Sequence, residues 1–232
     1  MISTLEKEVT LRFLKARKKD GFLNVISIFS FIGISLGVAV LIIVMSVMNG
    51  FRTELINKIV GFNPHITIQS YDENGIDLSK LQNNELSKIS KNITFSNSGE
   101  AIILRTNSSK GILLRGYKSD DFSKLQIIKN NKFKGNKQEL KRDSISIGNE
   151  LSFSLDIKIG DKITLMSPSG VETIIGNMLK QKTFIVHSIF NSGLADFDNN
   201  IALINLDTLD EFFGYKIKDR NLEIYLINPK NI

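Results

Sequence analysis

The sequence predicts an α+β protein in which one N-terminal transmembrane helix continues into a stalk and leads to a sheet-rich domain. Three observations support this fold class. Residues 21–51 contain no charged side chain, basic residues are concentrated before this run, and short β-rich runs dominate the remainder. We expect a cytoplasmic amphipathic segment at 1–20, a transmembrane helix at 21–50, a stalk helix at 51–62 and an exported domain at 63–232.

The uncharged run between Asp20 and Arg52 is long enough to cross a bilayer. A transmembrane helix needs about 20 apolar residues, whereas the apolar region of a signal peptide has roughly 7–15. No charged stripe marks a solvent-facing side, as it would on a surface helix of a soluble protein, and no small-x-small cleavage site follows. The run therefore predicts a transmembrane helix rather than a cleaved signal or a buried core helix.

The charges that flank this run predict its orientation. Two basic residues follow it closely, Arg52 and Lys58, and six precede it: Lys7, Arg12, Lys15, Arg17, Lys18 and Lys19. Because short cytoplasmic segments carry the excess of Lys and Arg, the N-terminus is expected in the cytoplasm and everything after Phe51 outside it. The absence of cysteine is compatible with export and decides nothing further.

Charge also bears on the partners. Residues 1–20 supply half of the net charge of +6, so the exported part is nearly balanced. A nucleic-acid-binding protein would need a concentrated basic face with stacking aromatic side chains, and the sequence shows no such stripe. The basic N-terminus is better explained by anionic lipid, with Leu5, Val9 and Phe13 spaced to form the apolar side of a surface helix. A frayed tail is the alternative.

Helical spacing continues past the bilayer. Phe51, Leu55 and Ile59 recur every fourth residue, which predicts a stalk that the following Gly-Phe-Asn-Pro stretch ends. Within the membrane helix, Gly33 and Gly37 form a small-xxx-small pattern that would let a second helix approach closely. Glycine is also common in transmembrane helices without any such role.

The exported part alternates strand and helix patterns. Gly160-Asp161 predicts a hairpin turn within the most patterned stretch, and strands are expected on both sides of a long loop at 168–181. Elsewhere we expect strands at 65–70, 100–106, 111–118, 144–148 and 221–229, a weakly amphipathic helix at 77–92 and a short helix at 206–213.

The long loop carries Ile174, Ile175 and Met178, apolar residues that a solvated loop does not favour. An exposed apolar loop tip indicates a docking site for a partner. The alternative is that the loop folds back onto its own domain.

No pattern of enzyme chemistry is present. The sequence lacks a phosphate-binding Gly-x-x-x-x-Gly-Lys-[Ser/Thr] loop and a Gly-x-Ser-x-Gly nucleophile motif. His65 and His187 lie in different expected strands without metal-ligand spacing, so no metal site is predicted. Asp196 and Asp198 are better explained as local backbone caps than as a general acid and base.

Residues 20–51, the following NPHI, and the segments GNELSFSLDIKIGDKITLMSPSG, KTFIVHSIFNSGLADFD and IALINL resemble the lipoprotein-releasing permeases of the LolC/LolE family. The resemblance covers the chain in order. It implies a non-catalytic subunit of a MacB-like type VII ABC system, located in the bacterial inner membrane, with a periplasmic domain of two lobes. Such systems use mechanotransmission to lift triacylated lipoproteins from the membrane.

The resemblance also implies partners: a cytoplasmic ATPase subunit that binds ATP and Mg, a second permease subunit, and a soluble periplasmic lipoprotein carrier. The carrier-docking hook of the family corresponds to Pro168 through Leu179, and Gln181 and Lys182 match positions that carry an amide and a basic side chain. The hook here has Ile174 and Leu179 where the family has prolines, and Thr164 replaces a basic residue.

The family continues through three further membrane helices that this sequence does not contain, which predicts a truncated product or a fragment of a four-helix permease. Because each exposed CH₂ of an acyl chain costs about 0.8 kcal/mol, lipid release needs an apolar route. Candidates for its lining are Val47, Met48, Phe51, Leu55 and Ile59, with helix packing as the alternative. Alternative functions are a related efflux or cell-division permease, or a single-pass periplasmic sensor or assembly factor.

Overall fold

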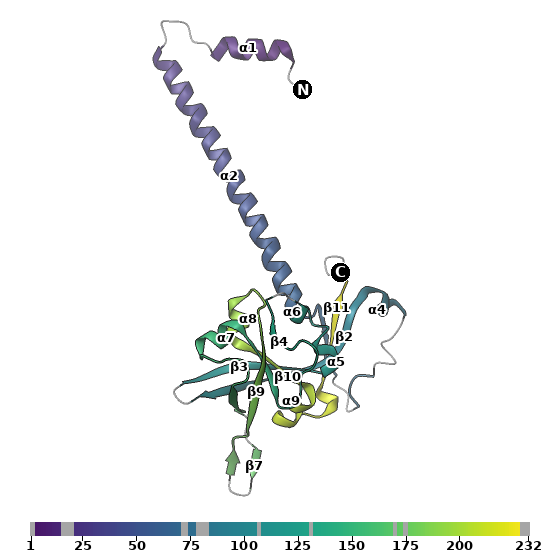
Figure 1. Cartoon of the computed structure of the whole chain (residues 1–232). Helices are drawn as coiled ribbons and strands as arrows, with labels where there is room; N and C mark the ends of the chain where they lie inside the picture. Colours follow the sequence, from purple (N-terminus) through teal and green to yellow (C-terminus); the bar gives the residue numbers. More distant parts are fainter. Residues whose placement is uncertain are drawn as a thin grey trace. The chain divides into compact units, whose positions relative to one another are not determined.

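The computed structural model of the chain describes residues 3–14, 21–70, 74–77, 84–105, 108–129, 132–168, 171–173 and 176–227. The chain divides into two compact units, Met1–Leu55 and Ile56–Ile232. The last two turns of the long helix α2 (Gly21–Phe62) belong to the second unit. Figure 1 shows the two helices of the N-terminal part and the sheet-rich domain that follows.

The first unit contains α1 (Thr4–Leu14) and most of α2. Ser3 caps α1: its hydroxyl accepts from the Glu6 backbone N–H at 3.3 Å, and the Glu6 carboxylate accepts from the Ser3 N–H at 2.8 Å. Helix α2 runs for 42 residues through the expected membrane helix and stalk. By length and composition, residues Val25–Phe62 include one candidate membrane span, and its apolar side chains are exposed.

Proline ends the long helix. Asn63 still donates its backbone N–H to the Ile59 carbonyl at 3.0 Å, but Pro64 has no N–H to donate and disfavours helical geometry in the residue before it. Strand β1 (Ile66–Ile68) begins two residues later. The expected helix end and the expected first strand are therefore confirmed.

Six strands of the second unit close into a barrel. The pairs β2–β3, β10–β5, β6–β9 and β2–β6 are antiparallel, and β10–β3 and β5–β9 are parallel, so each strand has a neighbour on both sides. The strands are β2 (Ser90–Arg105), β3 (Ser108–Tyr117), β5 (Ser144–Gly148), β6 (Lys162–Met166), β9 (Gln181–Phe190) and β10 (Ile201–Asn205).

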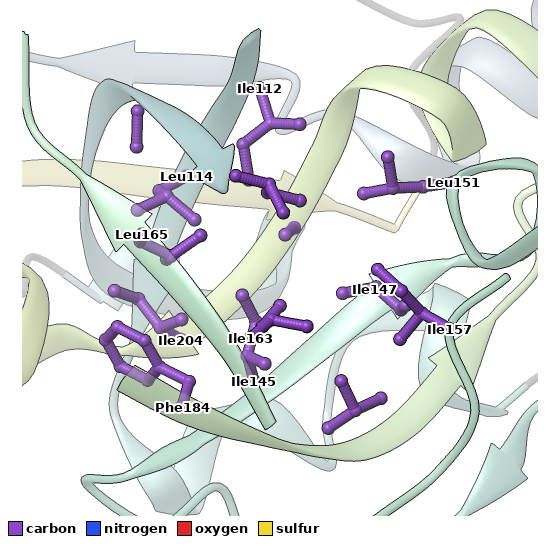
Figure 2. Packing of buried hydrophobic residues seen from close by; sticks show 14 of the residues in the cluster. Ile112, Leu114, Ile145, Ile147, Leu151, Ile157, Ile163, Leu165, Phe184 and Ile204 are labelled. Atoms are coloured by element: carbon purple, nitrogen blue, oxygen red, sulfur yellow. The ribbon is translucent and has the colours of Figure 1, made fainter. Parts of the chain in front are cut away.

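The barrel interior is filled by apolar side chains at every second position of these strands (Figure 2). This follows from strand geometry, because residues i and i+2 point to the same side of a sheet. Leu151, Ile157, Leu209 and Phe212 join the same cluster from outside the strands. The paired contributions are Ala101 and Ile103, Ile112 and Leu114, Ile145 and Ile147, Ile163 and Leu165, Phe184 and Val186, and Ala202 and Ile204.

A second hydrophobic cluster lies outside the barrel. The alternate side chains of β10, Ile201 and Leu203, point into it, and Phe62 joins from the end of α2. The sheet continues here through β11 (Asn221–Leu226), which pairs with β1 and with the first half of β2. The cluster is completed by α5 (Ser119–Phe122), α6 (Gln126–Lys129) and the segment containing β4 (Lys134–Gly135).

The remaining helices and strands are short. The helix expected at 206–213 is confirmed as α9 (Leu206–Phe213), where the Asn205 side chain accepts from the Asp207 and Thr208 N–H groups and Gly214 ends the helix in the left-handed region. The others are α4 (Asn84–Ile89), α7 (Asn149–Ser154), β7 (Val171–Thr173), β8 (Gly176–Met178), α8 (Ala195–Asn200) and the 3₁₀ turn η1 (Ile217–Asp219).

Two local expectations are wrong. Residues 90–92, placed at the end of a helix, begin β2, because pairing with β11 overrides a weak helical pattern. Gly160-Asp161 does form a turn, with Gly160 at φ 95°, but it precedes β6 after helix α7 and joins no two strands as a hairpin. The alternating apolar residues before it belong to α7 and the coil that follows.

Candidate functional site

A small hairpin extends from the β6–β9 pair and corresponds to the expected hook. Strands β7 and β8 pair antiparallel, with Val171 opposite Met178, and form a sheet separate from the barrel. At the base of the hairpin, Ser167 donates its N–H to the Lys180 carbonyl at 2.9 Å. Figure 1 shows this hairpin, labelled β7, projecting from the domain. A projecting element that the barrel does not need for its own pairing is suited to contact a partner.

The structure places only part of the predicted hook surface. Pro168 is exposed at its start and the Leu179 side chain is 49% exposed at its end. Met178 is the last residue of β8. Ile174 and Ile175 lie outside the described residues.

Gln181 and Lys182 start β9 but point to opposite sides of the strand, as consecutive strand residues do. Gln181 lies opposite Met166 on the exposed side, its amide 3.9 Å from the Met166 sulfur. Lys182 points toward the barrel rim, where its ammonium lies 3.7 Å from the Asp143 carboxylate and 5.6 Å from the centre of the Phe184 ring. The amide and the cation therefore do not form one contact patch beside the hook.

The five predicted route residues lie on one side of α2. At 100° per residue, they span about 120° of the helix circumference. The side chains of four of them are exposed, from 43% to 66%, and Leu55 is half-buried. We call this set the α2 stripe: Val47, Met48, Phe51, Leu55 and Ile59.

Gly33 and Gly37 fall within the same sector of the helix as the α2 stripe, by the same rotation per residue. A Cβ atom added at either glycine would meet nothing within 4 Å. The glycine pair and the apolar stripe thus form one continuous side, with small residues deep in the uncharged run and large ones toward its end.

A buried polar cluster, which we call the junction network, lies where α2 enters the domain. The Glu223 carboxylate accepts hydrogen bonds from Ser96 at 2.7 Å, Arg115 at 2.9 Å, Tyr117 at 3.0 Å and Tyr225 at 2.9 Å. These residues come from β2, β3 and β11. Four donors on one carboxylate compensate for the removal of that charge from water.

The same arginine holds the end of the helix. The Arg115 guanidinium lies 5.3 Å from the centre of the Phe62 ring and donates to the Asn63 side chain at 3.3 Å. The side chain of His65 accepts from the Leu226 backbone N–H at 2.8 Å, and its Nε2 is buried with no hydrogen-bond partner among the described residues. The final turn of α2 is therefore fixed to β3 and β11 by polar contacts as well as by burial.

Burial and neighbouring charges shift the pKa values of the arginine and the tyrosines of the junction network. Burial opposes the charge on Arg115, but Tyr117 and Glu223 more than offset it and raise the pKa of the guanidinium. Burial raises the pKa of the Tyr225 hydroxyl, and nearby Glu223 raises it further. Burial lowers the pKa of His65. The tyrosines therefore remain donors and the arginine remains charged near neutral pH.

This network was not among the features predicted from the sequence. Its signal in the sequence is one charged residue within each of two apolar strands, Arg115 in GILLRGY and Glu223 in NLEIYL. Such a charge is rarely buried without a partner, so two of them predict a pair. They are 108 residues apart, however, and only the fold shows that they meet.

Of the two candidate carboxylates, Asp198 has a structural role. Asp198 is buried and accepts from the Ser192 backbone N–H at 2.8 Å, which agrees with backbone capping. Desolvation raises its pKa. The described residues contain no group of three or more His, Cys, Asp or Glu side chains that could hold a metal ion.

Comparison with known proteins gives a family match over most of the chain. A model of the MacB-like periplasmic core domain matches residues 27–230. A protein named "Lipoprotein-releasing system transmembrane protein LolC" from Neisseria meningitidis is 28% identical over 98% of this chain and 56% of its own length. One named LolE from Haemophilus influenzae is 29% identical over 95% of this chain and 58% of its own length.

The chain thus spans about half the length of the curated relatives it matches. Among solved structures, the periplasmic region of MacB from Actinobacillus actinomycetemcomitans aligns with a TM-score of 0.42 and 11% identity, over 72% of this chain and 74% of that one. The extracellular domain of the transporter YknZ aligns with a TM-score of 0.41 and 14% identity, over 70% and 84%.

Proposed function

Because this chain belongs to the MacB-like periplasmic core domain family, we propose that it acts as a permease subunit that removes lipoproteins from the inner membrane and passes them to a periplasmic carrier. The observation that carries this proposal is the likeness to relatives named as lipoprotein-releasing transmembrane proteins. It extends from the long helix through the last strand of the domain.

In the proposed arrangement, the N-terminus is cytoplasmic and the barrel domain is periplasmic. A separate cytoplasmic ATPase subunit binds ATP and Mg, and a second permease subunit, identical or related, packs against the side of α2 that contains Gly33 and Gly37. Depleting this chain from its own cells should leave lipoproteins in the inner membrane, measured by membrane fractionation. Normal release after depletion would exclude this function.

We assign the lipid route to the α2 stripe. Acyl chains that leave the bilayer need a continuous apolar surface, and the stripe runs from the uncharged part of α2 to Ile59, close to where the helix enters the domain. A carboxylate within it would interrupt this surface at a cost similar to that of burying an unpaired charge.

Leu55→Asp and its neighbour Ile56→Asp test this assignment. Ile56 is 40% exposed at nearly the same height on the helix but lies outside the stripe. We expect Leu55→Asp to reduce the rate of lipoprotein release at least tenfold and Ile56→Asp to leave it within twofold. These ratios correspond to changes in activation free energy of about 1.4 and about 0.4 kcal/mol. Met48→Asp should behave like Leu55→Asp. Equal effects of Leu55→Asp and Ile56→Asp would contradict the route.

We assign carrier docking to the hook, from Pro168 to Leu179. Because β7 and β8 form a sheet of their own, replacing residues 169–178 with a two-residue turn should leave the barrel intact. We expect this variant to lose co-purification with the carrier while its thermal unfolding stays unchanged. Retained carrier binding in the folded variant would remove the docking assignment.

The roles of Gln181 and Lys182 in docking can be separated. Lys182→Ala also removes the contacts with Asp143 and the Phe184 ring, so its effect alone is ambiguous. Asp143→Asn is the matched control, because it removes the ion pair and keeps the cation. If Lys182 contacts the carrier, Lys182→Ala weakens binding and Asp143→Asn does not. Gln181→Ala should weaken binding without a change in stability, since its amide is exposed.

A further inference from the structure

Two adjoining hollows lie beside the end of α2. The first, of about 110 Å³, is lined by Lys91, Lys124 and Lys129 together with Gln126. The second, of about 190 Å³, shares Gln126 and is lined on its other side by Lys58 and Phe62 of α2. A Cβ atom added at Gly61 would lie 4.0 Å from the Gln126 Cγ. In Figure 1, α6 accordingly lies next to the end of the helix.

The first hollow, which we call the lysine hollow, is suited to an anion. Among the residues that the structure describes, none that lines it is acidic. The Lys91 ammonium donates to the neutral amide of Gln126 at 3.1 Å, and Lys124 pairs with Asp121 at 2.7 Å. Asp121 also accepts from Thr94 at 2.8 Å, so its carboxylate is shared between Thr94 and Lys124. The hollow itself is lined by three ammonium groups.

The concentration of charge extends along the chain. The exported part as a whole is nearly balanced, but residues 124–142 contain a single carboxylate, Glu139. Two basic residues of this segment, Lys124 and Lys129, line the lysine hollow, and like charges around one space raise the local concentration of oppositely charged ligands. The basic residues of this segment are Lys124, Lys129, Lys132, Lys134, Lys137, Lys141 and Arg142.

The position on α2 indicates which anion is available. Arg52 is the first charged residue after the uncharged run, and Gly61, beside Gln126, follows nine residues later. Nine helical residues span about 14 Å. The headgroup layer of a bilayer is roughly 5–8 Å thick and electrostatic attraction extends about 8 Å further at physiological ionic strength. The hollow therefore lies within reach of lipid phosphates whenever α2 spans a membrane.

From this geometry we propose that the lysine hollow binds the headgroups of anionic phospholipids of the leaflet from which α2 emerges. The three ammonium groups contact the phosphate, the amides of Asn92 and Gln126 hydrogen-bond to its oxygens or to headgroup hydroxyls, and Leu125 contacts the glycerol. This surface anchors the domain to the bilayer beside α2. It requires α2 to be inserted in a membrane but does not require lipoprotein release, so either proposal can fail alone.

Lysine acetylation of the full chain tests this binding. The chain is placed in nanodiscs of phosphatidylcholine alone or mixed with phosphatidylglycerol, and the acetylation rate of each lysine is measured by mass spectrometry. Attraction to an anionic surface is worth about a fivefold change for each lysine. We expect Lys91, Lys124 and Lys129 to be acetylated about fivefold more slowly with phosphatidylglycerol, and exposed Lys158 and Lys162 to change less than twofold.

Two further arms distinguish other sources of the same chemistry. Inorganic phosphate added to phosphatidylcholine nanodiscs should not protect the three lysines; equal protection would make the hollow a site for free anions and overturn the proposal. A polyglutamate peptide that protects them where phosphatidylglycerol does not would indicate an acidic protein segment instead. Equal acetylation rates in both nanodiscs would also refute lipid binding.

A pair of charge-matched variants separates this site from net charge. The triple variant Lys91→Gln, Lys124→Gln, Lys129→Gln should lose its preference for phosphatidylglycerol among lipids that co-purify in detergent. The control, Lys158→Gln, Lys162→Gln, Lys216→Gln, loses the same charge elsewhere on the domain and should keep it. Equal loss in both variants would show that overall charge, and not the lysine hollow, sets the preference.

Discussion

Glu223→Gln is the sharpest test of how the domain holds the end of α2. The substitution preserves shape and one acceptor oxygen but removes the charge that pairs with Arg115 at 2.9 Å. It also replaces one accepting oxygen with an NH₂ group, which donates. All four side-chain partners of Glu223 are themselves donors. The variant therefore leaves a buried cation without its counter-charge and at least one hydroxyl without an acceptor.

The expected cost follows from the burial of the pair, whose side chains are 10% and 6% exposed. Removing one partner of a buried ion pair costs about 3–5 kcal/mol. Because glutamine keeps part of the hydrogen bonding, we expect the lower end, about 3 kcal/mol. For a domain of this size, that loss lowers the Tm by about 6–12 °C.

Tyrosine fluorescence of the full chain in detergent gives a local readout. The chain has four tyrosines and no tryptophan, and Tyr117 and Tyr225 both bond to Glu223. Glu211→Gln is the control: its ion pair with Arg142 is 60% and 65% exposed, and such pairs contribute about 0–1 kcal/mol. A loss below about 1 kcal/mol for Glu223→Gln would refute the reasoning. So would additivity within about 0.5 kcal/mol in a double-mutant cycle with Arg115→Met.

Two further variants test the packing and charge of the domain. Asp198→Asn keeps the acceptor for Ser192 and removes a carboxylate whose pKa is raised by burial. A carboxylate with a raised pKa contributes stability that is present below its ordinary pKa of 3.8 and is lost as the pH rises through the pKa of the folded state. The variant should therefore gain stability relative to the native chain as the pH increases, measured by urea unfolding at several pH values. A fixed difference at all pH values would contradict this. Gly148→Ala would place its Cβ 2.0 Å from the Asp198 carbonyl oxygen and should cost about 3 kcal/mol or more, whereas Gly111→Ala, with nothing within 4 Å, should change stability by less than about 1 kcal/mol in the same assay.

Local patterns were sufficient for the helices with strong signals. The uncharged run and the Pro64 stop define α2, because these signals act within a few residues of where they occur. The helix expected at 206–213 agrees with α9, and the structure adds its Asn205 cap and its end at Gly214. The weak pattern at residues 77–92 failed where β11 pairs with the start of β2. Strand pairing between distant segments supplies hydrogen bonds that local propensity does not encode.

The sequence alone predicts one long apolar helix followed by a sheet-rich domain, and a loop after Pro168 that is unusual for its length and apolar content. Only the folded chain shows that six strands close into a barrel and that Arg115 meets Glu223. It also shows that Lys91 of β2, Lys124 of the turn before α6 and Lys129 of α6 line one hollow. The periodicity of a sequence reports which side of an element is buried. What that side contacts depends on the register and closure of strands far apart in the chain.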